Sequence, residues 1–147
     1  MSTNSYSRSL LHIIWGTHNH DKLLSSSEFR KKLSFFIYEY AKGKDIYPLA
    51  CFVNNDHVHI LVDLPTNITI ENSVKLLKGS SSHWVNQQEE YKTKFSWGRG
   101  FGAFSVSESN ADKVIDYIKH QKEHHKKKSF TEEYEGFLKA YKINVNR

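Results

Sequence analysis

The stretch NNDHVHILVDLP, residues 54–65, places two histidines, His57 and His59, one residue apart at the start of an apolar run. Aliphatic side chains occupy every second position of that run: Val58, Ile60, Val62 and Leu64. A period of two predicts a β-strand, in which residues i and i+2 point to the same face. One face is therefore aliphatic and the other begins with the two histidines. They are either ordinary residues of a half-exposed strand or a preset pair of metal ligands.

The segments around this strand predict an alternation of strands and helices. Ser25 and Glu28 have the spacing of a capping box at a helix start, and residues 54–56 supply a turn before the histidine strand. The other predicted elements are a strand at 10–18, a helix at 25–43, a strand at 45–53, a helix at 70–91 and a strand at 99–107. The order β-α-β-β-α-β predicts an α+β, ferredoxin-like antiparallel sheet with both helices on one face.

Two further helices are expected after this unit. The stretch SNADKVIDYIKHQKEHHKKKSF, residues 109–130, opens with Ser109 and Asp112 in capping-box spacing, and a short helix follows at about 131–140. Tyr117 and Gln121 are four residues apart, so they share one helical face. The histidine face of the sheet looks away from the first two helices, so this added helix is the one that can cover it.

The composition is that of one globular domain, residues 1–147, with an anionic partner. The chain has a formal charge of +5 and a pI of about 9.2, which favours nucleic acid as the partner. A single cysteine, Cys51, excludes an intramolecular disulfide and fits a reducing compartment. No apolar run approaches the ~20 residues of a membrane span, and the first residues lack the apolar core of a signal peptide. We expect a cytoplasmic protein without a membrane partner.

Taken one at a time, these residues have ordinary explanations. A His-x-His pair is compatible with two exposed strand residues. Tyr117 is compatible with a packed aromatic, and Gln121 with a solvated helix position. The order of the motifs along the chain is a more specific signal of function than any one of these residues.

From about residue 10 to residue 140 the chain resembles the single-tyrosine HUH transposases of small insertion sequences. DHVHILVDLP resembles that family's histidine–hydrophobe–histidine strand, and LKGSSSHWVNQ, FSWGRGFGAFSVS and VIDYIKHQKEHHKKKSFTEEY resemble its later blocks in the same order. The last block is the most specific, because a tyrosine followed four residues later by a glutamine and then by paired histidines is rare. Asn54 and Asn55 stand where relatives often carry an apolar residue and a proline.

The resemblance implies a role for each site residue. His57 and His59 would be metal ligands, Gln121 the third protein ligand and Tyr117 the nucleophile, with Mg²⁺ or Mn²⁺ as the ion. Two imidazoles and an amide are neutral, so the ion would keep its charge for the phosphate. A phenol, with a pKa near 10, is easier to activate than an aliphatic hydroxyl. The implied reaction cleaves single-stranded DNA, leaves a 5′-phosphotyrosine and a free 3′-hydroxyl, and later rejoins the strand.

The resemblance also implies partners. The expected substrate is hairpin-forming single-stranded DNA, and the expected assembly is a homodimer whose tyrosine helix docks on the partner's histidine strand. Basic residues predicted to hold phosphates are Lys75, Lys78, Lys126, Lys127 and Lys128. The run HHKKK, residues 124–128, is equally compatible with a solvated helix end, where cations favour the helix dipole.

Two other functions stay open. A zinc-dependent hydrolase using the His-x-His strand needs a further ligand, for which Asp63 lies on the same strand face. A domesticated transposase that binds DNA without cleaving it would keep the same fold. The proton acceptor for Tyr117 also stays open, with His120 and His124 nearby on the expected helix.

Overall fold

Four antiparallel strands form the sheet that the sequence predicts. The computed structural model describes residues 5–20, 22–91, 93–124 and 127–145. The strands are β1 (Leu10–Gly16), β2 (Tyr47–Val53), β3 (His57–Asp63) and β4 (Gly102–Val106). Their order across the sheet is β2-β3-β1-β4, and β3 pairs with both β1 and β2. The α+β, ferredoxin-like arrangement is confirmed, and the histidine strand occupies a central position in it.

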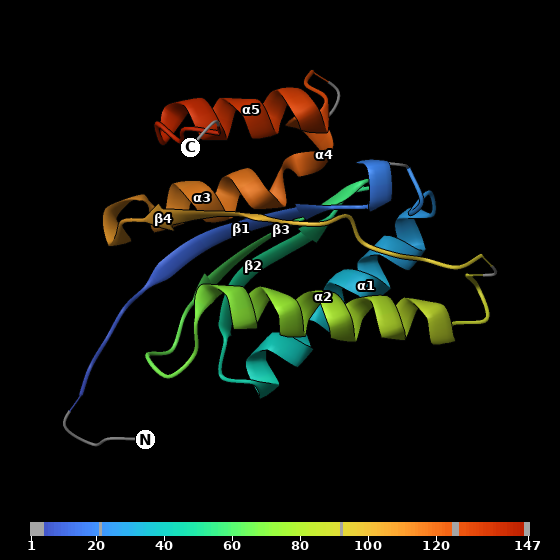
Figure 1. The fold of residues 1–147 in the computed structure, drawn as a ribbon, viewed down its shortest axis with the longest axis horizontal. Coiled ribbons are helices and arrows are strands. Elements are labelled where there is room, and N and C mark those ends of the chain that lie inside the picture. Colours follow the sequence, from blue (N-terminus) through green and yellow to red (C-terminus); the bar gives the residue numbers. More distant parts are fainter. Residues whose placement is uncertain (1–4, 21, 92, 125–126, 146–147) are drawn as a thin grey trace.

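Helices α1 (Ser27–Gly43) and α2 (Ile70–Gln87) cover one face of the sheet (Figure 1). The aliphatic side of β3, represented by Ile60 and Val62, packs beneath them in the main apolar core. The strands predicted at 10–18, 45–53 and 99–107 are each shorter by two to four residues, and one boundary of each helix also shifts. The first helix is capped by Ser26, whose hydroxyl accepts from the Phe29 amide at 3.2 Å, and the second ends at residue 87 instead of 91.

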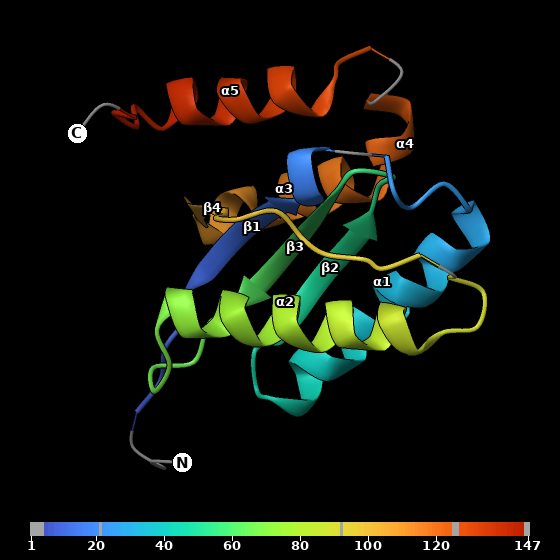
Figure 2. The same cartoon turned by 45° about the vertical axis from the view of Figure 1, so that its right-hand side comes forward.

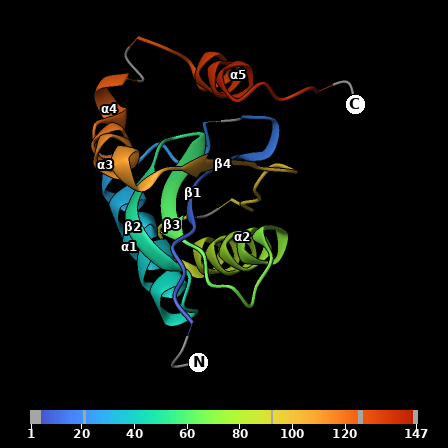
Figure 3. The same ribbon diagram turned by 90° about the vertical axis from the view of Figure 1, so that its left-hand side faces the viewer.

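Three helices lie over the other face: α3 (Ala111–Lys119), α4 (Gln121–His124) and α5 (Phe130–Ala140) (Figures 2 and 3). Helix α3 packs directly on the sheet, where Ile118 and Leu61 belong to one buried cluster. Tyr117 lies on α3, so the tyrosine helix is followed by two others. The histidine face is therefore covered, as the sequence analysis anticipated.

The predicted single helix over residues 109–130 is wrong. The chain turns out of α3 at His120, whose φ and ψ are −105° and 23°. This turn lets α5 run back over the sheet. The predicted Ser109–Asp112 capping box is also wrong, because a short 3-10 turn, η2 (Glu108–Asn110), places Ser109 inside it. The capping box that forms is at α5, between Ser129 and Glu132.

A second 3-10 turn, η1 (His18–His20), follows β1. Among the described residues, no helix has the length and apolar character required to cross a membrane.

Candidate active site

The two histidines of β3 are buried and face each other. His57 and His59 are both 0% exposed, and their Nε2 atoms lie 3.2 Å apart. Their strand lies between two neighbours, and α3 and α5 cover their face. Surface histidines would be exposed, so the first of the two readings of this motif is wrong.

A hydrogen-bond partner on the far side of each ring fixes its orientation. Nδ1 of His57 lies 2.7 Å from Oδ1 of Asp56, and Nδ1 of His59 lies 2.7 Å from Nε2 of His12. Such partners hold metal-binding imidazoles in place and select the nitrogen that faces the ion. Burial lowers the pKa of His12 well below its ordinary range, so His12 is neutral. Burial alone would also lower the pKa of His57, but its hydrogen bonds to Asp56 and Glu133 outweigh this effect and raise it.

Glu133, on α5, completes a group of three converging donor atoms. Its Oε1 lies 2.9 Å from Nε2 of His59 and 3.3 Å from Nε2 of His57. Two ligands at right angles on an ion with ~2.1 Å bonds lie about 3.0 Å apart. The three observed separations fall close to that value, so the donor set fits a divalent cation.

Tyr117 lies next to the same carboxylate. Its hydroxyl donates a hydrogen bond to Oε2 of Glu133, and its ring centroid is 5.9 Å from that of His59. Burial, and then the contact with Glu133, raise the pKa of Tyr117 above its ordinary value. Within this single chain, Glu133 therefore joins the tyrosine hydroxyl to the histidine pair.

The side chain of Gln121 is linked to His57 through hydrogen bonds of Asn54. It is fully buried, and its Oε1 accepts a hydrogen bond from Nδ2 of Asn54 at 3.4 Å. The same Nδ2 lies 3.1 Å from Nε2 of His57. Asn54 thus connects the predicted third ligand to the pair, and the ligand role of Gln121 stays a prediction.

The predicted DNA-contacting lysines fall into two groups. Lys127 and Lys128 line a cavity of about 370 Å³ together with Tyr117 and Glu133. Lys75 and Lys78 lie on α2, across the sheet from that cavity. Nζ of Lys78 donates to the carbonyl oxygens of Gly98 and Gly100, at 2.7 and 3.0 Å, and so ties the loop before β4. Lys126 lies outside the described residues.

Other residues suggested by the sequence are engaged elsewhere. Asp63 accepts from the Ser9 amide at 2.8 Å and pairs with Arg8. It lies at the opposite end of β3 from His57. His120 is exposed and its Nδ1 lies 2.8 Å from the carbonyl oxygen of Asp116, and the side chain of His124 lies outside the described residues.

Sequence reasoning missed three residues of the site. Asp56 carried a signal, because a carboxylate directly precedes the first histidine. His12 and Glu133 carried none, because they come from β1 and α5 and join the histidines only through strand pairing and helix packing.

Comparison with known proteins places this chain among transposases. The family model described as "Transposase IS200 like" matches residues 5–121. The transposases for insertion sequence element IS200 of Salmonella typhimurium (strain LT2) and of Salmonella typhi are each 29% identical over 104 residues, covering 67% of this chain and 68% of each relative.

Two solved structures share the fold. A putative transposase from Deinococcus radiodurans aligns with a TM-score of 0.61 and 23% identity, over 82% of this chain and 96% of that one. A REP-associated tyrosine transposase bound to a REP hairpin aligns with a TM-score of 0.60 and 15% identity, over 85% and 74%. Because the family model spans most of the chain, including β3 and α3, the chain belongs to the IS200-like transposase family.

Proposed function

We propose that residues 1–147 act as a single HUH transposase domain that cleaves and rejoins single-stranded DNA through a phosphotyrosine at Tyr117. The observation that carries the proposal is the shared carboxylate. Glu133 contacts the Tyr117 hydroxyl with one oxygen and the His57–His59 pair with the other. A nucleophile and a cation site therefore lie side by side, as transfer of a phosphoryl group requires.

The chain's own residues account for the steps. The oxygen of Tyr117 attacks phosphorus, an O–P bond to the tyrosine forms, and the bond from phosphorus to the 3′-oxygen breaks. The departing 3′-oxygen takes up a proton from solvent and becomes the free 3′-hydroxyl. Oε2 of Glu133 already accepts the hydrogen bond from this hydroxyl, so it is the nearest acceptor for the proton. In the return step a 3′-hydroxyl attacks the phosphotyrosine and Tyr117 leaves. The bond energy is kept in the ester throughout.

His57 and His59 would hold the divalent ion, with Glu133 or Gln121 as the third protein ligand. When bound, Mg²⁺ or Mn²⁺ would supply positive charge against the phosphate oxygens. The contacts of Asp56 and His12 with the far ring nitrogens turn both Nε2 atoms toward this position. The family model ends at residue 121, so Glu133 belongs to the segment of the chain that follows the matched residues.

The proposed substrate is hairpin-forming DNA, since one structural neighbour is a transposase bound to a REP hairpin. The decisive experiment incubates the protein with hairpin-bearing single strands selected from a random pool, in Mg²⁺ or Mn²⁺. We expect a covalent adduct on denaturing gels, with the phosphate mapped to Tyr117 by mass spectrometry and no adduct in excess chelator. An adduct at another residue, or full activity in chelator, would contradict the mechanism.

The same experiment separates the alternative functions. Two histidines and a glutamate, as in the group His57, His59 and Glu133, also hold the metal in some hydrolases. A metal-dependent hydrolase is therefore one alternative function. A hydrolase releases cleaved strands without an adduct. A domesticated binder shifts the DNA on native gels and leaves it intact.

We also propose that the protein works as a homodimer whose tyrosine helices exchange between subunits. Movement of α3 about the segment SVSESN, residues 105–110, would carry Tyr117 from its own histidines to those of the partner. The test co-expresses Tyr117→Phe with His57→Ala and isolates the mixed dimer. Sites formed in trans give one intact site and return about half of the activity. If the mixed dimer is folded and paired but inactive, the trans arrangement is wrong.

A further inference from the structure

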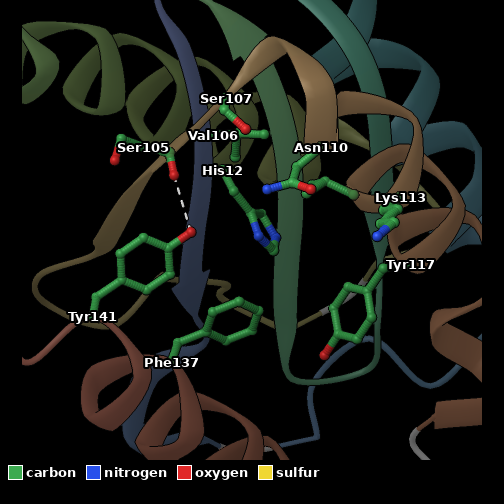
Figure 4. Close-up of a pocket in the computed structure, with 10 residues that line it drawn as sticks. His12, Ser105, Val106, Ser107, Asn110, Lys113, Tyr117, Phe137 and Tyr141 are labelled. Carbon is green, nitrogen blue, oxygen red and sulfur yellow. Dashed lines mark hydrogen bonds between the residues drawn. The ribbon is translucent and has the colours of Figure 1, made fainter.

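A second cavity adjoins Tyr117, and neither Lys127 nor Lys128 lines it. It has a volume of about 380 Å³ and lies between β4, α3 and the far end of α5 (Figure 4). Tyr117 lines this cavity as well as the one that holds the two lysines. The proposed nucleophile therefore borders two cavities, either of which can receive part of a strand that brings a phosphate to it.

Aromatic rings held by their neighbours form one wall of the cavity. Phe137 stacks on Phe104 with centroids 5.2 Å apart, and it meets His12 edge-on at 5.1 Å. Tyr141 lies against Phe104 at 4.9 Å, and its hydroxyl donates to the carbonyl oxygen of Ser105 at 2.9 Å. Because these contacts already order the rings, a flat ligand can stack here with little further loss of side-chain freedom.

The opposite wall is polar. Asn110 precedes α3, a position where an asparagine side chain usually caps the helix, but this one makes no capping bond. Its amide instead points into the cavity toward His12 (Figure 4). Lys113, one turn into the helix, also lines the cavity, and no carboxylate among the described residues pairs with it.

We infer that this cavity binds an unpaired nucleobase of the strand whose phosphate Tyr117 attacks, a step that rests on the proposed function. Its volume lies in the range of small-molecule sites, and its aromatic wall matches the way proteins stack single-stranded bases. The Asn110 amide offers a donor and an acceptor to a base edge. Lys113 would hold a phosphate at this cavity, and Lys127 and Lys128 would hold phosphates at the other.

The test compares short strands with and without bases. Hexathymidylate, hexadeoxyadenylate and an abasic hexamer of equal charge are titrated into the ¹⁵N-labelled full-length chain. Without a hairpin they measure binding apart from cleavage. We expect the base-carrying hexamers to bind at least about fivefold more tightly, since stacking of one base contributes at least that factor. Only these hexamers should shift the side-chain amide of Asn110 and the backbone amides of Phe137 and Tyr141.

Matched variants locate the effect. Tyr141→Ala should remove the advantage of the base-carrying hexamers and leave abasic binding unchanged, whereas Tyr141→Phe keeps the ring and the advantage. Asn110→Ala should change the ratio of adenylate to thymidylate affinity. Tyr47→Ala removes an exposed ring at the start of β2 and Ser109→Ala changes the residue beside Asn110, and both should behave as wild type.

Two outcomes would overturn the inference: equal binding of abasic and base-carrying hexamers, or a preference for bases that Tyr141→Ala does not change. Neither result would contradict adduct formation at Tyr117, which is tested separately. Conversely, base-specific shifts in a protein that forms no adduct would support the pocket and contradict the proposed chemistry.

Discussion

The two faces of the sheet are built from the same strands but follow different chemistry. Under α1 and α2 the side chains are aliphatic and aromatic, and they form the largest apolar cluster of the described residues. Under α3 and α5 the sheet presents two smaller apolar clusters and, among them, the buried polar groups His12, His57 and His59. Adjacent residues of β3 therefore belong to different environments, since successive strand side chains point to opposite faces.

The difference shows how one strand, β3, can stabilise the fold with one face and supply the candidate site with the other. Burial of Val58 and Ile60 stabilises the fold without any requirement for exact hydrogen-bond geometry. Burial of His57 and His59 is costly unless each ring nitrogen has a partner, and Asp56, His12 and Glu133 provide those partners. The site therefore depends on α5 in a way that the apolar core does not.

The largest expected effect separates two tyrosines on opposite faces. Tyr117→Phe should abolish the covalent DNA adduct while lowering the free energy of unfolding by only about 1.5–3 kcal/mol, the cost of one hydrogen bond to a carboxylate. Tyr91→Phe, in the apolar cluster against Phe29 and Phe95, should form adducts at the wild-type rate. Denaturing gels and thermal unfolding measure both. Adducts in the Tyr117→Phe protein would identify a different nucleophile.

The next comparison uses neighbours on β3. His59→Ala should weaken Mn²⁺ binding, measured by calorimetry, by more than about 100-fold, because loss of an outer hydrogen-bond partner alone costs ~10–100-fold. Ile60→Ala should lower the free energy of unfolding by about 2–5 kcal/mol and leave Mn²⁺ affinity unchanged at temperatures where the protein is folded. Unchanged Mn²⁺ affinity in the His59→Ala protein would show that His59 is not a metal ligand.

Two glutamates of α5 give a third, smaller contrast. Glu133→Gln should reduce Mn²⁺ affinity by at least about tenfold, because a neutral amide replaces the carboxylate beside both imidazoles. Glu135→Gln, two residues along on the exposed side, is the matched control. If both variants bind Mn²⁺ as wild type does, Gln121 is left as the third protein ligand, and Gln121→Ala then becomes the deciding variant.

The smallest expected effect concerns DNA affinity. Replacing Lys127 and Lys128 by alanine should flatten the log–log salt dependence of single-strand binding by up to about 1.4, at roughly 0.7 for each lost contact. Lys75→Ala tests the other face, and a change there of about 0.7 would place DNA across α2 as well. An unchanged slope in the double variant would show that Lys127 and Lys128 make no phosphate contacts and are solvated residues between two helices.

Much of the fold could be predicted because its signals are local. Alternation along β3, helical spacing before Gly43 and turn residues at 54–56 each depend on near neighbours, and the four strands and the first two helices appear close to the expected residues. The C-terminal helices were harder. The residues from Ser109 to Phe130 include no glycine or proline, so neither helix-breaking residue marks the end of α3 at His120 or the start of α5 at Phe130.

By itself, the sequence determined the histidine strand with its two faces and the order of the four strands and first two helices. The expectation that Tyr117 and Gln121 share one helical face is not met, because α3 ends at Lys119 and Gln121 begins α4. Only the tertiary structure decided that both histidines are buried, that His12 and Asp56 orient them, and that Glu133 joins them to Tyr117. It also assigned Lys127 and Lys128 to the tyrosine side and Lys75 and Lys78 to the other. The reason is that periodicity encodes which way a side chain points, whereas contacts between residues as distant as 59 and 133 arise only when separate elements pack together.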